Sequence, residues 1–186
     1  MENWVYDKLT VCSFAQHYLT GDPLPEALFV KMKAAKNFQA GRRLLHQLYL
    51  GALDLALHSV YDPMHASGVT PLQFMHSEGV GILAQFLLEP LHPDDLSLCS
   101  FGHIFSGGYA AGYYSYLWAE VMSADAFASF EEAGLDNEAA VRATGVRFRD
   151  TFLASGGATE SAEVFRRFRG RDATPAALLR HRGLGD

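Results

Sequence analysis

Apolar residues recur along this chain at helical spacing, and no convincing stretch alternates between apolar and polar as a strand would. The longest such stretch begins after Pro25 and runs from Glu26 to about Tyr61, without an internal proline. Gly41 and Gly51 are its weak points. The pattern predicts one long helix that Asp62 ends, with an apolar stripe made of Leu28, Met32, Ala35, Phe38, Leu45, Leu48, Leu55 and His58.

Capping and turn residues divide the rest of the chain into further helices. Thr70 and Asn137 are predicted N-caps, and Gly134 a C-cap. The pattern predicts six or seven helices, and therefore an all-α, irregular multi-helix fold forming a single domain over residues 1–186, without repeats or linkers. Besides the long helix, the expected helices cover residues 2–19, 71–88, the tyrosine-rich run below, 138–153, a short segment from 161, and 175–183.

The most informative stretch is FGHIFSGGYAAGYYSYLWAEVMSADAFASF, residues 101–130. On a helix, Tyr109, Tyr113 and Tyr116 at i, i+4 and i+7 share one face. His103 precedes them, and the Gly107–Gly108 pair allows another backbone to come close because no Cβ stands in the way. One interpretation is an aromatic core stripe, since aromatic residues at this spacing commonly pack. The other is a surface that holds a peptide or a developing oxyanion, because buried phenols need hydrogen-bond partners that Phe or Leu would not.

Composition and charge indicate a globular protein and argue against a nucleic-acid or phosphate-binding function. With 49% hydrophobic and 19% charged residues the chain is typical of a globular protein. A net charge of -6 gives no support to a nucleic-acid partner. A basic cluster is flanked by acidic residues, which favours a solvated helix face over a phosphate site; its members are Arg166, Arg167, Arg169 and Arg171.

Cysteine usage and the lack of long apolar runs bear on location. Cys12 and Cys99 are far apart and have no metal-ligand spacing, which suits a reducing compartment. Residues 1–20 lack a basic region followed by a long apolar run, and no window has the length of apolar residues that a bilayer span needs. We expect a soluble protein without membrane insertion.

A search for catalytic motifs finds donors without a nucleophile or base. The eight histidines include no His-Glu-x-x-His, and no Gly-x-Ser-x-Gly elbow is present. Cys99 and His103 remain open as a Cys-His pair, although nothing local explains how the thiol would be activated. We therefore expect no metal site within this chain.

Six strings, in order and over nearly the whole chain, resemble the C-terminal part of the thimet oligopeptidase, neurolysin and oligopeptidase A family of zinc metallopeptidases. Residues 66–98 are the least characteristic. The strings are MENW (1–4), HYLTGDPLP (17–25), MKAAKNFQAG (32–41), ALHSVYDP (56–63), FGHIFSGGYAAGYYSYLWAEVMSADAF (101–127) and FRRFRGRDATPAALLRHRGL (165–184).

The resemblance implies roles for the tyrosine-rich stretch. In that family zinc is held by a His-Glu-x-x-His helix and a later glutamate, with the motif's Glu as general base, and all of these lie upstream of the segment equivalent to MENW. His103 and Tyr116 match residues that contact substrate and stabilise the oxyanion. Tyr109 and Tyr113 match further substrate-facing tyrosines, and Gly107–Gly108 a flexible wall of the channel. We expect a chain that is inactive alone and needs zinc only in the complete enzyme.

Three accounts of such a chain remain open. It is a piece of a complete oligopeptidase that cleaves short peptides, a non-catalytic subunit or peptide-binding module of a larger assembly, or a chain completed by a partner that carries the zinc helix. Each implies short peptides or other protein subunits as partners. An apolar face with Trp4, Val5 and Phe14 would then be covered by a partner. The resemblance fits the cytoplasm or the interior of a mitochondrion or chloroplast.

Overall fold

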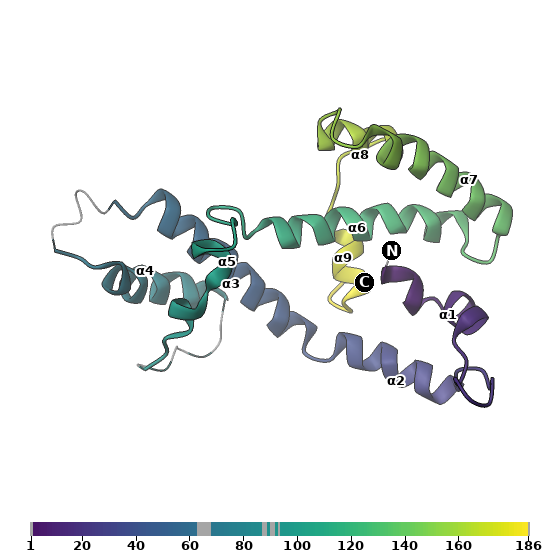
Figure 1. Cartoon of the computed structure of the whole chain (residues 1–186), viewed down its shortest axis with the longest axis horizontal. Coiled ribbons are helices and arrows are strands. Elements are labelled where there is room, and N and C mark those ends of the chain that lie inside the picture. The colour runs from purple at the N-terminus through teal and green to yellow at the C-terminus, as the bar shows by residue number, and fades with distance from the viewer. Residues whose placement is uncertain (1, 63–67, 87–88, 90–91, 93, 186) are drawn as a thin grey trace. The chain divides into compact units, whose positions relative to one another are not determined.

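The computed structural model describes residues 2–62, 68–86, 89, 92 and 94–185, with only the backbone described for 71, 72, 75, 78 and 79. The prediction of an all-α fold is confirmed: apart from one isolated bridge between Gln16 and Pro23, the described residues form helices, turns and loops. Figure 1 labels the α-helices. Their bounds, with the 3-10 helices η1 and η2 and the π-helical turn η3, are η1 Glu2–Tyr6, α1 Lys8–Phe14, α2 Glu26–Asn37, α3 Ala40–Ser59, α4 Pro71–Phe86, η2 Ser97–Ser100, α5 Gly102–Phe105, α6 Ser115–Ala133, α7 Glu138–Phe148, η3 Arg149–Leu153, α8 Ser161–Arg169 and α9 Ala176–His181.

The chain divides into two compact units. The terminal unit comprises Met1–Ala40 and Ala119–Asp186, and the central unit comprises Gly41–Trp118. Each is described here by itself. The prediction of a single domain stays a prediction, because it concerns cooperative folding, which compactness does not test.

The central unit packs α3, α4 and α5 around a small apolar core. Leu53 is completely buried, and the core around it consists of Tyr49, Leu57, Leu83, Phe101, Ile104 and Tyr113. The predicted cap at Thr70 is confirmed: the Gln73 amide donates to the Thr70 hydroxyl (3.2 Å), and the Gln73 side chain accepts from the Thr70 amide (2.8 Å). The helix extends at least to Phe86; its predicted last residues, 87 and 88, lie outside the described residues.

Two apolar clusters stabilise the terminal unit, one rich in phenylalanine and one made mainly of alanine. Phe165 and Phe168 of α8 are buried against Ala126 of α6 and two rings that follow one another down α7 and η3, Phe148 and Phe152. A second contact joins Ala124 and Ala128 of α6 to Ala177 and Leu178 of α9. Two predicted caps on α6 and α7 are confirmed. Gly134 has a φ of 85° directly after α6, and the Asn137 side chain accepts from the Ala140 amide (3.1 Å).

Several helix boundaries differ from the prediction, and the helix expected over residues 2–19 is divided into the 3-10 helix η1 and α1. The first helix ends at Phe14 instead of residue 19, and Tyr18 beyond it is 87% exposed. The predicted long helix is broken between α2 and α3, where Phe38 is extended and Gln39 takes a left-handed φ of 52°. The break precedes the weak point expected at Gly41. Because neither Phe38 nor Gln39 is a helix breaker, local propensity gave no sign of it.

The prediction of a wholly solvated basic cluster is also wrong. Arg166 and Arg167 do lie on the surface beside acidic residues. Arg169 and Arg171, however, bind Asp125 of α6, whose carboxylate is completely buried and also accepts from the Thr174 amide at 2.9 Å. Burial by itself would raise the pKa of Asp125, but the bonds from Arg171 and Thr174 and the two positive charges outweigh it and lower that pKa. Two of the four arginines therefore stabilise the interior.

Candidate functional site

The helix of the tyrosine-rich stretch begins further along the chain than predicted. α6 begins at Ser115, so Tyr109 and Tyr113 lie in the turns that precede it, and only Tyr116 is helical. Two left-handed residues keep the chain from forming a helix before Ser115. Their φ values are 78° at Gly108 and 54° at Ala111. The prediction that three phenols share one helical face is wrong for this reason.

The rings nevertheless gather, by a route other than helical spacing. The centroids of Tyr109 and Tyr116 are 5.1 Å apart, and those of Tyr113 and Tyr116 are 5.3 Å apart. His103, from the short helix α5, lies 6.0 Å from Tyr109, 5.8 Å from Tyr113 and 6.0 Å from Tyr116. These four residues form what we call the aromatic cluster, and the structure brings together the four aromatic residues among the six candidates predicted from the sequence.

The members of the aromatic cluster differ in exposure. Tyr113 is 9% exposed, and its hydroxyl donates to the Gln47 side chain (3.1 Å), so it belongs to the core of the central unit. Tyr109 and Tyr116 are 37% and 39% exposed, and His103 is exposed. The core-stripe interpretation thus fits Tyr113, whereas the other three side chains reach the surface.

Tyr116 is held as a neutral hydrogen-bonding group. A hydrogen bond with the Tyr109 side chain, followed by partial desolvation and the nearby phenols, raises the pKa of Tyr116 above its ordinary value. Even at its ordinary pKa of about 10 a phenol keeps its proton at neutral pH, so Tyr116 is a donor there with or without this shift.

A close backbone approach was expected at the Gly107–Gly108 pair, and it is found at Gly107 alone, since a Cβ at Gly108 would meet nothing within 4 Å. A Cβ built on Gly107 would stand 2.8 Å from the His103 carbonyl oxygen and 2.9 Å from the His103 Cα, distances that real side chains do not tolerate. The near backbone is the chain's own: the Gly107 amide also donates to the Gly102 carbonyl at 2.9 Å. The glycine therefore folds the chain tightly after α5 and fixes where His103 stands. Gly108 supplies the left-handed turn that follows.

One face of α3 supports the turns that carry the tyrosines, and the sequence analysis missed it. Its residues recur at i, i+4, i+7 and i+11 and all contact the region 111–114 or one another. They are Gln47, Gly51, Asp54 and His58, and we call them the α3 support face. Gly51 allows close approach, since a Cβ there would lie 3.5 Å from the Tyr114 Cα. The sequence did carry a signal for this face. Gln47, Asp54 and His58 are polar residues spaced seven and four apart in a largely apolar helix.

Asp54 is the centre of the α3 support face. Its carboxylate is completely buried; Oδ1 accepts from the Ala111 amide and Oδ2 from the Tyr113 amide, both at 2.9 Å. His58 Nδ1 lies 2.8 Å from Asp54 Oδ1 and 2.9 Å from the Asp54 carbonyl oxygen. Because both neighbours are acceptors, Nδ1 must carry a proton. A sequence separation of 57 to 59 residues is bridged by this one carboxylate.

The described residues do not offer a zinc site. Within the described ranges, no three His, Cys, Asp or Glu side chains are placed to hold a metal ion. Cys12 and Cys99 are free thiols, and Cys99 is exposed. The His103 ring contacts the cluster tyrosines and Phe101. We therefore derive no metal-dependent step from this chain's own side chains.

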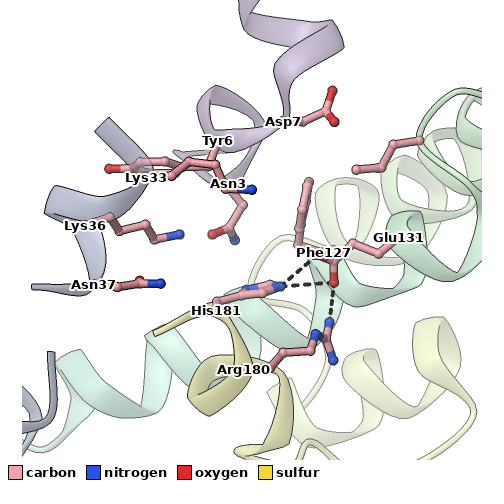
Figure 2. Close-up of a pocket in the computed structure, with 11 residues that line it drawn as sticks. Asn3, Tyr6, Asp7, Lys33, Lys36, Asn37, Phe127, Glu131, Arg180 and His181 are labelled. Atoms are coloured by element: carbon pink, nitrogen blue, oxygen red, sulfur yellow. Dashed lines mark hydrogen bonds and ion pairs between the residues drawn. The ribbon is translucent and has the colours of Figure 1, made fainter. Parts of the chain in front are cut away.

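A separate cavity of about 370 Å³ lies in the terminal unit, lined by residues from η1, α2, α6 and α9 (Figure 2). Glu131 binds both Arg180 and, at 3.0 Å, His181 Nε2. The bond from His181 lowers the pKa of Glu131 against the effect of burial, and the positive charges add to it. Burial, with the neighbouring Lys33, lowers the pKa of Lys36 at the same cavity. Since the Glu131 carboxylate is already bound by Arg180 and His181, the cavity fits a structural role better than a catalytic one.

Comparison with known proteins gives the family of this all-α chain. Residues 1–184 match the model of peptidase family M3, and the chain belongs to that family. It is 52% identical to a probable cytosolic oligopeptidase A and 50% identical to an organellar (chloroplastic/mitochondrial) oligopeptidase A, both of Arabidopsis thaliana, over 184 residues. It is 41% identical to oligopeptidase A of Escherichia coli strain K12, also over 184 residues.

The matches cover almost all of this chain and a minor part of each relative. They take in 99% of the chain but only 25%, 22% and 26% of those three proteins. The chain thus spans about a quarter of the length of the curated relatives it matches. In the described residues, no helix combines the length and apolar character needed to cross a bilayer.

Proposed function

We propose that this chain supplies the substrate-facing side of a metallo-oligopeptidase active site that acts on short peptides. The observation that carries the proposal is the aromatic cluster, in which two half-exposed phenols and an exposed imidazole lie within about 6 Å of one another, ring to ring. Membership of family M3 supports peptides as the substrate class.

Within this proposal Tyr116 and His103 donate to the carbonyl oxygen of the scissile peptide as negative charge develops on it. A neutral phenol suits the task, and a tyrosine phenol keeps its proton at neutral pH. Donors aimed at a developing oxyanion typically lower the barrier by about 3 to 4 kcal/mol each. Tyr109 flanks the same position, because its ring centroid lies 5.1 Å from that of Tyr116.

The other predicted site residues take supporting places in the proposal. The Tyr113 hydroxyl is engaged with Gln47, so substrate contact at Tyr113 stays a prediction that would have to use its ring. Gly107 and Gly108 form a narrow wall beside the cluster, as no side chain projects from them.

Zinc chemistry is proposed for the complete enzyme and not for the described residues alone. The zinc-binding residues and the general base of the family are expected upstream of the segment equivalent to MENW. We accordingly expect the isolated chain to show no peptidase activity. Incubating the purified, zinc-supplemented chain with an internally quenched peptide tests this, and turnover that a chelator abolishes would refute it.

The donor roles are best tested in a chimera, because the chain aligns with about a quarter of oligopeptidase A from Escherichia coli. The corresponding segment of that enzyme is replaced by this chain, and cleavage of a short quenched peptide is followed. Tyr116→Phe is expected to lower kcat by about 10²- to 10³-fold with little change in KM, as removing an oxyanion donor does. His103→Ala is expected to lower kcat as well.

A matched control removes a hydroxyl elsewhere. Tyr18 is 87% exposed in the terminal unit, and Tyr18→Phe is expected to leave kcat and KM unchanged. A Tyr116→Phe chimera with unaltered kcat would exclude the donor role. A chimera that is inactive before any substitution is compared by circular dichroism with the parent enzyme, and native helix content with no activity would count against the proposal.

A second function, a non-catalytic peptide-binding module or subunit of an assembly, is favoured by one observation. Large apolar side chains of the first two helices and the loop between them are exposed, and they include Leu9, Phe14, Tyr18, Leu19 and Val30. Relatives named for the cytosol and for organelles support either compartment for this chain. Stable co-purification with a larger complex in the native source, without a zinc-bearing companion, would favour this function over the first.

A further inference from the structure

The completely buried carboxylate of Asp54 accepts hydrogen bonds mainly from one short stretch of backbone. Its two oxygens receive the amides of Ala111 and Tyr113, and His58 supplies a third donor to Oδ1. Both amides belong to the turns between Gly108 and Ser115, which join the two exposed phenols of the aromatic cluster. A buried carboxylate placed in this way fixes backbone geometry.

Within the turns, the Tyr113 ring is anchored in the core, whereas the backbone is held mainly by short local bonds. Ala111 is held at a φ of 54°, a conformation that a residue with a Cβ rarely adopts. The Gly112 amide donates to the Tyr109 carbonyl at 2.8 Å and the Ser115 amide to the Gly112 carbonyl at 3.0 Å, so each local bond closes a small turn on itself. The Asp54 carboxylate ties the backbone of these turns to α3, and the bond from the Tyr113 hydroxyl to Gln47 adds a side-chain tie.

We propose that Asp54 is a positioning residue for the peptide-binding side of the site: by holding the amides of Ala111 and Tyr113, it sets the turn that brings Tyr109 against Tyr116. The consequence for peptide cleavage rests on the proposed function of the aromatic cluster. The consequence for the geometry of the two tyrosines does not.

A purely structural role for the buried carboxylate makes a different prediction. If Asp54 only stabilised the central unit, replacing it would lower stability without altering how Tyr116 titrates in the molecules that remain folded. If it positions the turn, the contact between the Tyr109 and Tyr116 side chains weakens, and the pKa of Tyr116 falls toward that of a free phenol. The titration of Tyr116 thus separates the two roles.

The first variant is Asp54→Asn in the full chain. The amide keeps the volume of the carboxylate but turns one acceptor into an NH₂ group that faces a backbone N–H. Hydrogen exchange of the Tyr113 amide is expected to rise at least about tenfold, since a bond to a charged group contributes at least that factor. The Tyr116 titration, followed by NMR of ring-labelled tyrosine, is expected to move to lower pH. Circular dichroism over the same pH range confirms that the chain stays folded.

A matched control and a milder variant accompany it. Asp94 is an exposed aspartate of the same unit, with a side chain 91% exposed, and Asp94→Asn is expected to change neither measurement. His58→Ala removes only the third donor, from a partly exposed position, and is expected to shift both measurements in the direction of Asp54→Asn by a smaller amount. If Asp54→Asn does not fold, the His58 variant decides: a lowered Tyr116 pKa supports the proposal, and an unchanged one overturns it.

The outcomes also distinguish the positioning role of Asp54 from the proposed function of the aromatic cluster. Folded Asp54→Asn with unaltered exchange, or with faster exchange but an unaltered Tyr116 titration, overturns the positioning role. Binding of a short, uncleavable peptide to the unsubstituted chain, followed by the same tyrosine signals, tests the cluster as a peptide site. Failure of peptide binding alongside the expected Asp54 result would refute the proposed function and leave the positioning role standing.

Discussion

Replacing Asp125 by alanine should destabilise the terminal unit more than any surface change. The substitution removes an acceptor that holds Arg169, Arg171 and the Thr174 amide on a completely buried carboxylate. The Arg169 side chain is only 5% exposed, so its guanidinium cannot move fully into water when its partner is lost. It keeps Glu132 as a second partner, at 2.7 Å.

The size of the effect follows from which groups are left behind. Breaking a buried ion pair by removing one partner costs about 3 to 5 kcal/mol. Arg171 has a side chain 43% exposed and regains water, and Arg169 retains Glu132, so we expect the lower end, about 3 kcal/mol. For a chain of this length each kcal/mol lowers Tm by about 2 to 4 °C, and the expected decrease is about 6 to 12 °C.

Urea unfolding followed by circular dichroism at neutral pH measures the loss. The control is Asp172→Ala, which removes an exposed carboxylate bound to Arg166 and is expected to cost less than about 1 kcal/mol. Equal free energies of unfolding for the two variants would refute the reasoning, because it depends on burial and not on the number of ion pairs.

The pH dependence gives a second check on Asp125. Its pKa is lowered in the folded chain, so the stability it contributes is fully present above the unfolded value of about 4 and is lost as the pH falls through the lower folded value. Below about pH 4 the difference between the unsubstituted chain and the Asp125→Ala variant should therefore shrink. A difference that stayed constant down to the acid transition would contradict this assignment.

Three further substitutions test local features. Gly107→Ala places a Cβ 2.8 Å from the His103 carbonyl oxygen and is expected to cost more than about 1 kcal/mol, with the His103 ring signals shifted in NMR spectra. Gln39→Gly relieves a left-handed residue, at a φ of 52°, and is expected to raise the free energy of unfolding by up to about 1 kcal/mol in urea titrations. Tyr113→Phe removes the bond to Gln47 and is expected to cost about 1 kcal/mol by the same measurement, whereas no loss would mean that water replaces the phenol.

Local signals in the sequence predicted those features that local chemistry decides. The caps at Thr70, Asn137 and Gly134 were found because each acts within a few residues of itself. The all-α class followed from spacing alone. The four members of the aromatic cluster were also identified, although by way of a helix that does not begin until Ser115.

Features that depend on partners distant in the sequence were missed. Nothing near Asp54 indicates that the amides that donate to it lie beyond residue 110, and nothing near Arg169 points back to Asp125, 44 residues earlier. The break at Gln39 was missed as well, because helix propensity marks neither Phe38 nor Gln39 as a helix breaker. The tertiary structure was needed wherever a polar group finds its hydrogen-bond partner dozens of residues away in the sequence.

The long interval bridged by Asp54 has a consequence for synthesis on the ribosome. The carboxylate is made 57 residues before the first amide that binds it and 59 before the second. Until Tyr113 has left the exit tunnel, α3 cannot bury this side chain without leaving it short of donors, so the nascent helix is expected to keep that face in water. Docking of α3 and assembly of the tyrosine turns then occur as one late event, and a pause in translation before residue 113 would prolong the exposure of its apolar neighbours Leu53 and Leu57.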